Sequence, residues 1–296
     1  MQAGVYVRRV TAYNLAAEMS TISSFLHQFP IITIHVDHPI DILLPSSHRR
    51  RRRRGTKKGN DSPSSSNNNY RQAKARIDEL DALQLGITLC DANGRLPLTV
   101  APVGGGGGAV ETAWQIGFSD FDLAAHYHHA VVDTDAVARH RAAGVDFEGL
   151  RARGVPAAAF ARALFAAAIG HRRLTWVAFG GLYGFGFLLK ILTGGAPLPD
   201  TAEGFVSWLT EFLGGEVYDG EYVAARLKDA GVVDMGGELV SVARALGAPA
   251  AEVAVPRQAG EKSLVACQVF MRMTGLFFAY HNVAVHRAKI HGLHCH

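Results

Sequence analysis

The stretch from Trp176 to Thr193 (WVAFGGLYGFGFLLKILT) constrains this chain more than any other. A strand-like apolar segment, 174–179, leads through two glycines into a segment whose apolar side chains recur at helical spacing. An abrupt change from strand to helix is typical of the edge of a sheet, where binding and catalytic residues often lie. Here the turn supplies Gly180, Gly181 and Gly184, which carry no functional group.

The length and composition predict a globular protein with one large domain or two small ones. The chain has 296 residues, of which 48% are hydrophobic and 19% charged. Its net charge of +4 depends on eight basic residues in one segment, without which the charge would be +4 − 8 = −4. These residues are Arg49, Arg50, Arg51, Arg52, Arg53, Arg54, Lys57 and Lys58. They lie in a low-complexity stretch, 46–69, that we expect to form a mobile surface loop.

The basic residues of this loop are open to several interpretations. They can follow an RNA backbone, bind an acidic partner, serve as a nuclear import signal, or form a tolerated, solvated insertion.

Cysteine usage and hydropathy argue against secretion and membrane insertion. Cys90, Cys267 and Cys295 are odd in number and far apart, which predicts a reducing compartment. The N-terminus lacks an apolar core followed by a cleavage site, so we expect no secretory signal. Lys190 and several glycines interrupt the apolar run 174–193, which we therefore interpret as a buried strand and helix.

The order of expected elements predicts a mixed sheet flanked by helices. A helix over 14–28 precedes strands at 31–36, 84–90 and 113–118. An Asn93-Gly94 turn predicts a hairpin after the second strand, and the glycines 104–108 predict a flexible hairpin tip rather than a phosphate loop. Further helices and strands are expected as follows: a helical region over 133–168, strands at 174–179 and 217–218, and helices at 201–213, 220–229, 237–246 and 259–287.

Five segments, in the same order, resemble the Ccr-associated factor one (Caf/Pop) family, the DEDD-type poly(A) ribonuclease subunit of the Ccr-Not deadenylase complex. They are FPIITIHVDHPI (29–40), YRQAKARIDELDALQLGITLCDANGRLP (70–97), AWQIGF (113–118), WVAFGGLYGFGFLLKILT (176–193) and RQAGEKSLVACQVFMRM (257–273). The resemblance implies a single domain, 1–296, with an RNase H-like α/β fold, in which 46–69 is a basic loop and 286–296 a histidine-rich tail. It also implies hydrolysis at the 3′ end of RNA by two Mg²⁺ or Mn²⁺ ions held by four carboxylates.

The residues aligned with the family's site differ from its pattern. Where the first strand of the family supplies an Asp and a Glu, this chain has His35 and Asp37. The second acidic position is Gly184. In the third motif, Arg257 replaces the general-base histidine, and Lys262 replaces the last aspartate. Asp37 is thus the one acidic position that remains, and it is one methylene shorter than the glutamate.

These replacements predict that no metal cofactor binds, with Asp37 at most contacting a cation. A lysine ammonium repels Mg²⁺, and a glycine offers no side-chain oxygen. Nearby carboxylates do not suggest a rebuilt site; they are Asp41, Asp219, Glu221 and Glu261. Glu261 in particular points about 100° away from position 262 on a helix. The opposite charges of Asp37 and Lys262 lead to the hypothesis that they form an ion pair in the emptied metal pocket.

The function predicted from this resemblance is that of a catalytically degenerate deadenylase-like protein, an interaction or RNA-binding subunit in poly(A) tail turnover. The implied partners are the Not scaffold subunit, the leucine-rich-repeat nuclease subunit and RNA. A weak metal-dependent 3′-to-5′ exoribonuclease and a polyanion-binding module based on the arginine loop are the alternatives. We expect the cytoplasm as its location, with the nucleus as a second one.

Histidines and aromatic residues give weaker signals. Histidines cluster in AHYHHA (125–130) and in the tail 286–296, but none has the spacing of a specific metal site, which favours adventitious affinity. Tyr70, Trp114 and Phe118 can stack on bases, yet at such positions core packing is commoner.

Overall fold

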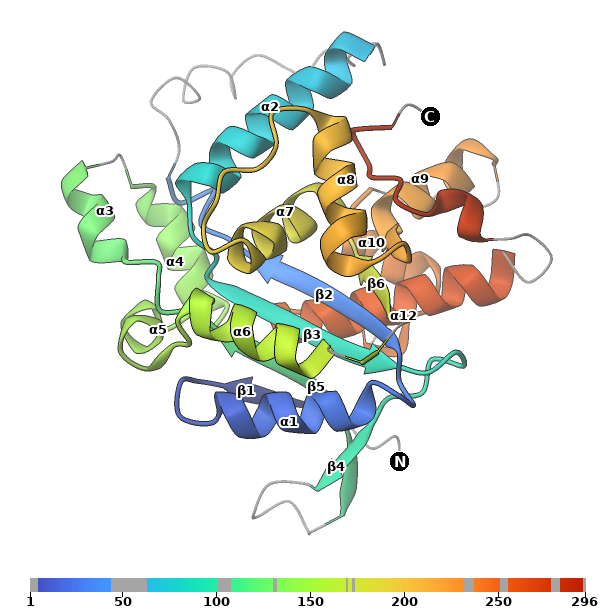
Figure 1. Cartoon of the computed structure of the whole chain (residues 1–296), viewed down its shortest axis with the longest axis horizontal. Helices are drawn as coiled ribbons and strands as arrows, with labels where there is room; N and C mark the ends of the chain where they lie inside the picture. The colour runs from blue at the N-terminus through green and yellow to red at the C-terminus, as the bar shows by residue number, and fades with distance from the viewer. Residues whose placement is uncertain are drawn as a thin grey trace.

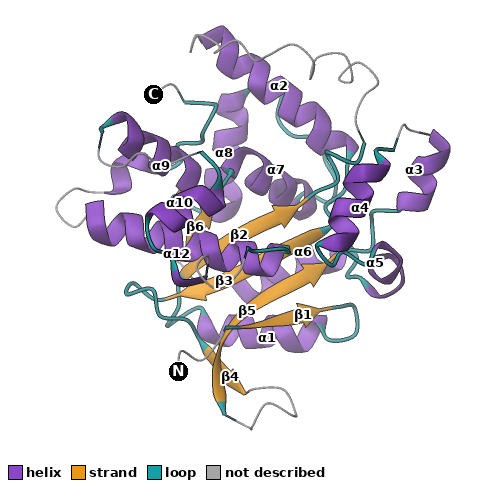
Figure 2. Cartoon of the chain, turned by 180° about the vertical axis from the view of Figure 1, so that it is seen from behind, coloured by secondary structure: helices purple, strands orange, loops and turns teal. Residues whose placement is uncertain are grey.

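A mixed sheet between two layers of helices forms the body of the protein (Figures 1 and 2). The computed structural model describes residues 5–43, 63–100, 108–129, 132–168, 170–171, 174–231, 237–250, 255–277 and 283–294. The strands are β1 (Tyr6–Val10), β2 (Ile31–Asp37), β3 (Gln84–Cys90), β4 (Leu98–Val100), β5 (Ala109–Gly117), β6 (Thr175–Ala178) and β7 (Val217–Asp219). Their order is β1-β5-β3-β2-β6-β7, and β4 pairs with β5 outside this path.

The helices cover both faces of the sheet. They are α1 (Leu15–Phe25), α2 (Pro63–Glu79), α3 (Leu123–His129), α4 (Thr134–Ala142), α5 (Phe147–Arg153), α6 (Ala157–Ala168), α7 (Gly181–Leu192), α8 (Ala202–Leu213), α9 (Gly220–Asp229), α10 (Leu239–Ala245), α12 (Ala259–Phe277) and the 3₁₀ helix η2 (Val283–His286). Helices α1, α6 and α7 pack on one face, and α12 crosses the other (Figures 1 and 2).

The topology confirms the predicted α/β class with a mixed sheet. β2, β3 and β5 form the antiparallel part, and β6 and β7 continue from β2 as parallel strands. The edge strand β1, which pairs in parallel with β5, was not predicted. Its five residues, YVRRV, do not alternate between apolar and polar, so the sequence pattern alone does not distinguish a strand from a loop there.

The prediction of a surface loop over 46–69 is wrong for residues 63–69. Residues 44–62, with all eight basic residues, lie outside the described part of the chain. Residues 63–69, however, belong to α2, which begins at Pro63, a residue well suited to a first helical position. The apolar side chains of Tyr70, Ala73 and Ile77 are buried and anchor this helix, so its polar first turns extend from a packed segment.

The predicted hairpin through Asn93-Gly94 is wrong. The turn itself forms, with Gly94 at φ +76°, but β3 is already paired with β2 on one side and β5 on the other. The chain therefore continues to β4, which pairs antiparallel with β5. A hairpin around the glycine run is thus confirmed, while its tip at 101–107 lies outside the described residues.

The last long helix is shorter than the predicted 259–287. Helix α12 ends at Phe277, and the chain reappears as η2 after an undescribed segment. The α12 N-terminus approaches β3 closely, because a Cβ added at Gly86 would lie 1.9 Å from the carbonyl oxygen of Ala259. This contact determines where the first turn of α12 lies over the sheet.

The core supports the structural interpretation of the apolar and aromatic residues. Tyr70, Trp114 and Phe118 are almost completely buried, which excludes base stacking by these side chains in this conformation. In α7, Phe187, Leu188 and Leu192 are buried in the same core cluster. Among the described residues, no helix is long and apolar enough to span a membrane.

Candidate functional site

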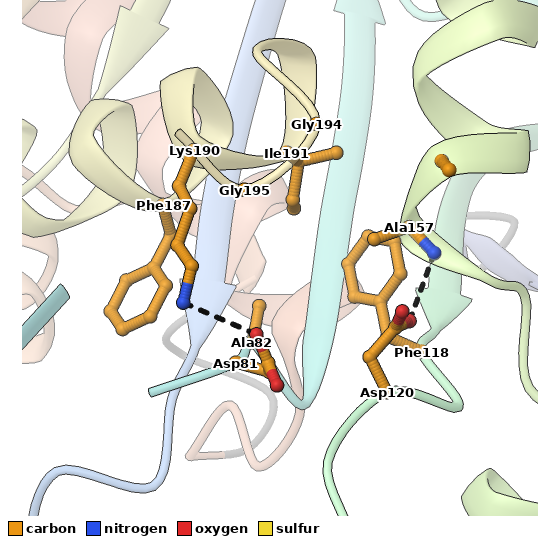
Figure 3. A pocket seen from close by; sticks show the side chains of 11 residues that line it. Asp81, Ala82, Phe118, Asp120, Ala157, Phe187, Lys190, Ile191, Gly194 and Gly195 are labelled. Atoms are coloured by element: carbon orange, nitrogen blue, oxygen red, sulfur yellow. Dashed lines mark hydrogen bonds and ion pairs between the residues drawn. The ribbon is translucent and has the colours of Figure 1, made fainter. Parts of the chain in front are cut away.

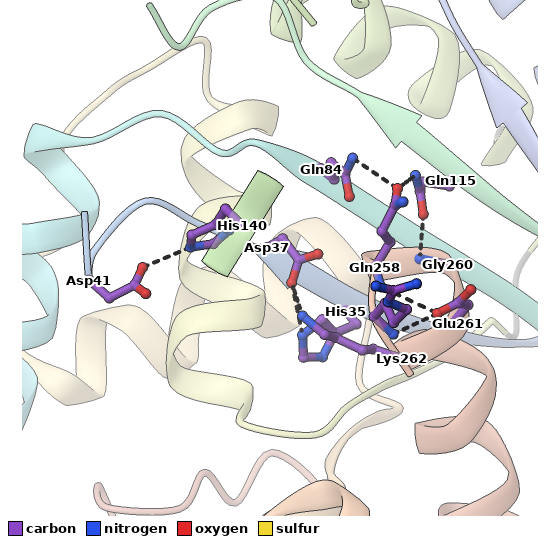
Figure 4. Close-up of polar contacts among 11 residues, drawn as sticks. His35, Asp37, Asp41, Gln84, Gln115, His140, Gln258, Gly260, Glu261 and Lys262 are labelled. Carbon is purple, nitrogen blue, oxygen red and sulfur yellow. Dashed lines mark hydrogen bonds and ion pairs between the residues drawn. The ribbon is translucent and has the colours of Figure 1, made fainter. Parts of the chain in front are cut away.

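The carboxyl end of β2 meets the first turn of α12 at the candidate site (Figure 4). His35 and Asp37 project from alternate positions of β2, and Lys262 projects from α12. Lys262 Nζ donates to Asp37 Oδ1 at 2.5 Å. The Asp37 side chain is 6% exposed and that of Lys262 27%. The predicted ion pair between these two residues is therefore confirmed.

The Asp37 carboxylate is held ionised by its neighbours. Burial by itself raises the pKa of a carboxylic acid, but His35 and the Lys262 ammonium outweigh it and lower the pKa of Asp37 to about 2. His35 Nε2 lies 3.6 Å from the same oxygen, Oδ1. Asp37 is thus an anion at neutral pH with its cationic partner beside it.

The two histidines that flank Asp37 differ in their surroundings. The His38 ring stacks on Phe187 at 5.3 Å between ring centroids and lies beside Tyr183. Burial lowers the pKa of His38 to about 4, so its imidazole is neutral at physiological pH. Nδ1 of both His35 and His38 is buried without a hydrogen-bond partner. His38 acts here as an aromatic packing residue.

The other two predicted site positions, Gly184 and Arg257, do not contact the Asp37–Lys262 ion pair. Gly184 lies in the first turns of α7, where an added Cβ would be 3.4 Å from the Ala178 Cβ. The exposed Arg257 precedes α12, and its Nη2 donates to the Ala142 carbonyl at 2.6 Å. The structure thus brings His35, Asp37 and Lys262 together, whereas Arg257 binds the end of α4.

The carboxylates considered as substitutes have other roles. Glu261 accepts hydrogen bonds from the backbone N–H groups of Arg257 and Gln258, which caps α12. Asp41 pairs with His140 at 2.9 Å, and Figure 4 shows this pair well apart from the Asp37–Lys262 contact. The prediction that Glu261 misses the site is confirmed.

Asp219 and Glu221 form a second carboxylate site, at the end of β7. Asp219 is fully buried and accepts backbone hydrogen bonds from His291 at 2.9 Å and Glu221 at 3.0 Å. Burial raises the pKa of Asp219 to about 6. Burial, together with the Asp219 charge, raises the pKa of Glu221 to about 7. These groups organise the turn into α9 and the C-terminal segment.

A row of glutamine amides continues from the ion pair across the sheet (Figure 4). Gln84 lies opposite Asp37 in the β2–β3 register. Its Nε2 donates to Gln258 Oε1 at 3.3 Å, and Gln115 Nε2 donates to the same oxygen at 2.5 Å. Gly260 N–H donates to Gln115 Oε1 at 3.2 Å. In the sequence these glutamines contribute only to the family resemblance, because nothing in their spacing shows that they meet.

The donors at this site do not fit a pair of divalent cations. Mg²⁺ and Mn²⁺ need several oxygen ligands, and two such ions need several negative charges. The one carboxylate here already binds an ammonium group, and Gly184 supplies no oxygen. Over the described residues there is also no group of three or more His, Cys, Asp or Glu side chains able to hold a metal ion.

Other sequence-predicted features are placed as follows. His126 stacks on Phe121, with 5.0 Å between the ring centroids, and His294 lies beside Tyr222. Cys90 and Cys267, distant in sequence, are both buried free thiols in one apolar cluster. The neighbouring Cys267 thiol and burial raise the pKa of Cys90 far above its ordinary value, which makes it unreactive.

Neither of two surface cavities in the described part of the chain is lined by the ion pair. One, of about 240 Å³, is lined by Phe118, Phe187 and Ile191, with Lys190 at its edge (Figure 3). Lys190 is already bound to the Leu80 carbonyl at 2.8 Å and to Asp81 at 3.2 Å. The other cavity, of about 270 Å³, is lined by the amide residues Gln84, Gln115 and Gln258.

Comparison with characterised proteins shows consistent similarity over nearly the whole chain. CCR4-associated factor 1 homolog 7 of Arabidopsis thaliana is 28% identical over 276 residues, 93% of this chain and 88% of that protein. Poly(A) ribonuclease pop2 of Schizosaccharomyces pombe is 24% identical over 275 residues, 92% of this chain and 70% of that protein. CCR4-NOT transcription complex subunit 7 of Caenorhabditis elegans is 25% identical over 275 residues, covering 93% and 78%. No family model matches the chain.

Solved structures of Pop2 and CAF1 are also similar over nearly the whole chain. S. pombe Pop2p in its Mg²⁺- and Mn²⁺-bound form superposes with a TM-score of 0.74 at 24% identity, covering 97% of this chain and 99% of that one. Yeast CAF1 co-crystallised with the NOT1 MIF4G domain superposes with a TM-score of 0.70 at 22% identity, covering 96% of each chain. The predicted DEDD exonuclease fold is confirmed.

Proposed function

Because the chain belongs to the Caf1/Pop2 family, we propose that it is a family member that keeps the fold and no longer cuts RNA. The observation that carries this proposal is the contact between Lys262 Nζ and Asp37 Oδ1 at 2.5 Å. The ammonium group is bound to Oδ1 of Asp37, the one aligned acidic residue that a metal ion could use. A cation bound there would first have to displace it.

Charge supports the same conclusion. In the family pattern, four carboxylates balance two dications. Here Asp37 and Lys262 already balance each other, so a dication would enter a neutral pair and meet the lysine charge at short range. The position aligned with the second acidic ligand is Gly184, which adds no negative charge.

The function that remains is assembly, or RNA binding without cleavage, within a Ccr-Not-type deadenylase complex. A relative is named as a subunit of the CCR4-NOT complex, and another was co-crystallised with the NOT1 MIF4G domain. The chain aligns with the latter over 96% of its length, so the fold that presents the docking surface is present. The Not scaffold and the leucine-rich-repeat nuclease subunit are the partners we propose.

An RNA-shortening assay tests the loss of catalysis. The unmodified protein is incubated with a 5′-labelled RNA ending in oligo(A), with Mg²⁺ or Mn²⁺, beside a restored variant carrying His35→Asp, Asp37→Glu, Gly184→Asp and Lys262→Asp. We expect no shortening by the unmodified protein. Processive shortening that a chelator abolishes would contradict the proposal and favour the weak exoribonuclease.

Metal binding gives a readout independent of activity. The melting temperature of each protein is measured with and without Mn²⁺, which stabilises a folded protein that binds it. We expect a Mn²⁺-dependent rise for the restored variant and none for the unmodified chain. The matched control carries Lys262→Asp alone, which removes the ammonium group without restoring the other ligands and should show at most a small rise.

Assembly is tested by size-exclusion chromatography with a NOT1 MIF4G domain. We expect co-elution of the unmodified protein and of the ion-pair double variant Asp37→Asn/Lys262→Met alike, since docking does not depend on the emptied site. Failure of the unmodified, folded protein to co-elute would contradict the scaffold role.

A further inference from the structure

The segment 283–294 forms a strap over the outer edge of the sheet, beside α8 and α9 (Figure 1). β7 is the last strand in the sheet order, and its Val217 carbonyl accepts the Ala288 N–H at 2.8 Å. Ile290 is fully buried and Leu293 is 9% exposed, and both belong to the core cluster that contains Val217. The strap thus closes a strand edge by a backbone hydrogen bond and by apolar contacts.

One residue of the strap covers two carboxylates. The His291 N–H donates to Oδ2 of Asp219 at 2.9 Å, and Nε2 of His291 lies 3.8 Å from Oε1 of Glu221. Asp219 is completely buried, whereas the Glu221 side chain is 29% exposed. Opening of the strap would therefore remove a donor from Asp219 and admit water to both carboxylates.

The groups that face Glu221 come from three elements. Burial, together with the charge of Asp219 on β7, raises the pKa of Glu221 to about 7. The strap contributes the His291 imidazole at 3.8 Å. The start of α7 contributes the uncharged Gly180, where an added Cβ would lie 3.7 Å from Oε2 of Glu221. With the strap closed, ionisation of Glu221 thus places a second negative charge beside Asp219 in a largely desolvated position.

The other charged and titratable groups of the strap have different partners. Burial and a neighbouring arginine of α9 lower the pKa of His286, and burial and the charge of Lys289 lower that of His294. Both imidazoles are therefore neutral at pH 7. Arg287 is paired with Glu216 at 2.5 Å, just before β7 begins. None of these contacts brings a compensating charge to Glu221.

The strap also carries backbone strain. Ala288 has φ +55°, and it is the one non-glycine residue with a positive φ in the part of the chain that the structure describes. This left-handed conformation is unfavourable for a residue with a Cβ. The strained residue is the one whose N–H reaches the edge of β7. Opening of the strap would relieve this strain and offset part of the lost contacts.

We propose that the strap opens and closes in an equilibrium linked to protons, in which ionisation of Glu221 beside Asp219 favours the open form. The closed form prefers a protonated Glu221, whereas in the open form water surrounds the ionised group. The stabilisation of the closed form is fully present below the ordinary pKa of glutamate, about 4.3, and is lost as the pH rises through 7.

Opening would change two features of this edge of the sheet. It would uncover the Val217 carbonyl and the apolar surface under Ile290. Asp219 also accepts the N–H of Gly181 at the start of α7, so one carboxylate connects the strap to the strand-to-helix turn of 176–193. The strap would thus make the exposure of a strand edge depend on pH near neutrality. The proposal does not depend on the loss of catalysis proposed above.

Hydrogen–deuterium exchange of the full chain, followed by mass spectrometry of peptides from 283–294, tests the proposal. After correction for the intrinsic exchange rate, opening should be about tenfold more frequent at pH 8 than at pH 6. The reason is that the pKa of Glu221 changes from about 7 in the closed form to about 4.3 in the open form. Peptides from β2 and β3 are the internal reference and should stay protected, because local opening leaves the core folded. Equal opening at both pH values, or strap exchange no faster than that of β2 and β3, would overturn the proposal.

Two glutamate variants test which group is responsible. Glu221→Gln keeps the size of the side chain and removes its ionisation, so the strap should open less often and lose most of its pH dependence. Glu211→Gln, at an exposed glutamate of α8, is the matched control and should keep the tenfold difference. An unchanged pH dependence in Glu221→Gln would contradict the proposal.

A histidine variant separates the carboxylates from the imidazole. His291→Asn keeps the backbone N–H that binds Asp219 and removes the ring beside Glu221. We expect the pH dependence of strap opening to remain in this variant. Its loss would assign the proton linkage to the histidine and overturn the role of Glu221.

Discussion

Asp37 and Asp219 end two parallel strands of the same sheet, and both are buried, yet their pKa values are shifted in opposite directions. The pKa of Asp37 is lowered to about 2, because the hydrogen bond with His35 and the charge of Lys262 outweigh the effect of burial. The pKa of Asp219 is raised to about 6, because burial dominates over backbone N–H donors. Its neighbour Glu221, at about 7, experiences both burial and a like charge.

The difference shows what each site is suited for. A carboxylate that has a fixed cation beside it is stabilised as an anion and has no charge left for a metal ion. A carboxylate bound only by backbone N–H groups acts as a structural acceptor whose protonation changes near neutral pH. Substitutions at either site test this difference between the two carboxylates.

The largest effect is expected from Gly86→Ala, because it displaces the helix that brings Lys262 to Asp37. A methyl group there would lie 1.9 Å from the Ala259 carbonyl oxygen, a backbone atom. We expect a loss of more than about 3 kcal/mol in the free energy of unfolding, measured by urea denaturation. Gly184→Ala is the matched control, since its Cβ has 3.4 Å to Ala178, and it should be neutral or slightly stabilising. Equal stability of the two variants would contradict the role of Gly86.

A smaller loss is expected from Lys262→Met, which leaves Asp37 buried without its cation. We expect a decrease of about 2–3 kcal/mol in the free energy of unfolding at pH 7, and a rise in the pKa of Asp37. The double variant Asp37→Asn/Lys262→Met should recover most of the loss, because no uncompensated charge remains. If the single variant were as stable as the original protein, the ion pair would have no structural role.

The pH dependence of the same pair has a definite sign. The folded pKa of about 2 lies below the value of about 3.9 in an unfolded chain. The stabilisation is therefore fully present above pH 4 and is lost as the pH falls toward 2. Acid denaturation of the double variant should lack this component.

The smallest effect is expected at the second site, from Glu221→Gln. Its folded pKa of about 7 lies above the unfolded value, so ionisation of Glu221 destabilises the folded protein as the pH rises through 7. Removing the charge should stabilise the protein by about 1–2 kcal/mol at pH 8 and by little at pH 5. Thermal melts at the two pH values measure this, with the exposed Glu211→Gln as control. A pH-independent effect would mean that Glu221 ionises normally.

Local patterns predicted the elements better than their partners. Ile31–Asp37 and Gln84–Cys90 are strands because their apolar runs fit a buried sheet. The Asn93-Gly94 turn was also real, but its predicted hairpin was not, since β5 already occupied the free side of β3. Which strands pair depends on segments that are distant in the sequence. A turn motif such as Asn93-Gly94 does not show which of them lies beside β3.

Local sequence patterns were sufficient to predict the α/β fold, the strand-to-helix change at 176–193 and the chemical groups available at the candidate site. The glycines of that stretch now have separate explanations: Gly184 leaves an open position in a buried helix, and Gly181 approaches the Asp219 carboxylate, within 2.9 Å of an added Cβ. The contact between Lys262 and Asp37, a hypothesis from their aligned positions, was established by tertiary packing, which alone brings three glutamines to one oxygen and two distant cysteines together. The reason is physical: side-chain identity fixes charge and hydrogen-bonding capacity locally, whereas which groups meet depends on how α12 lies across the sheet.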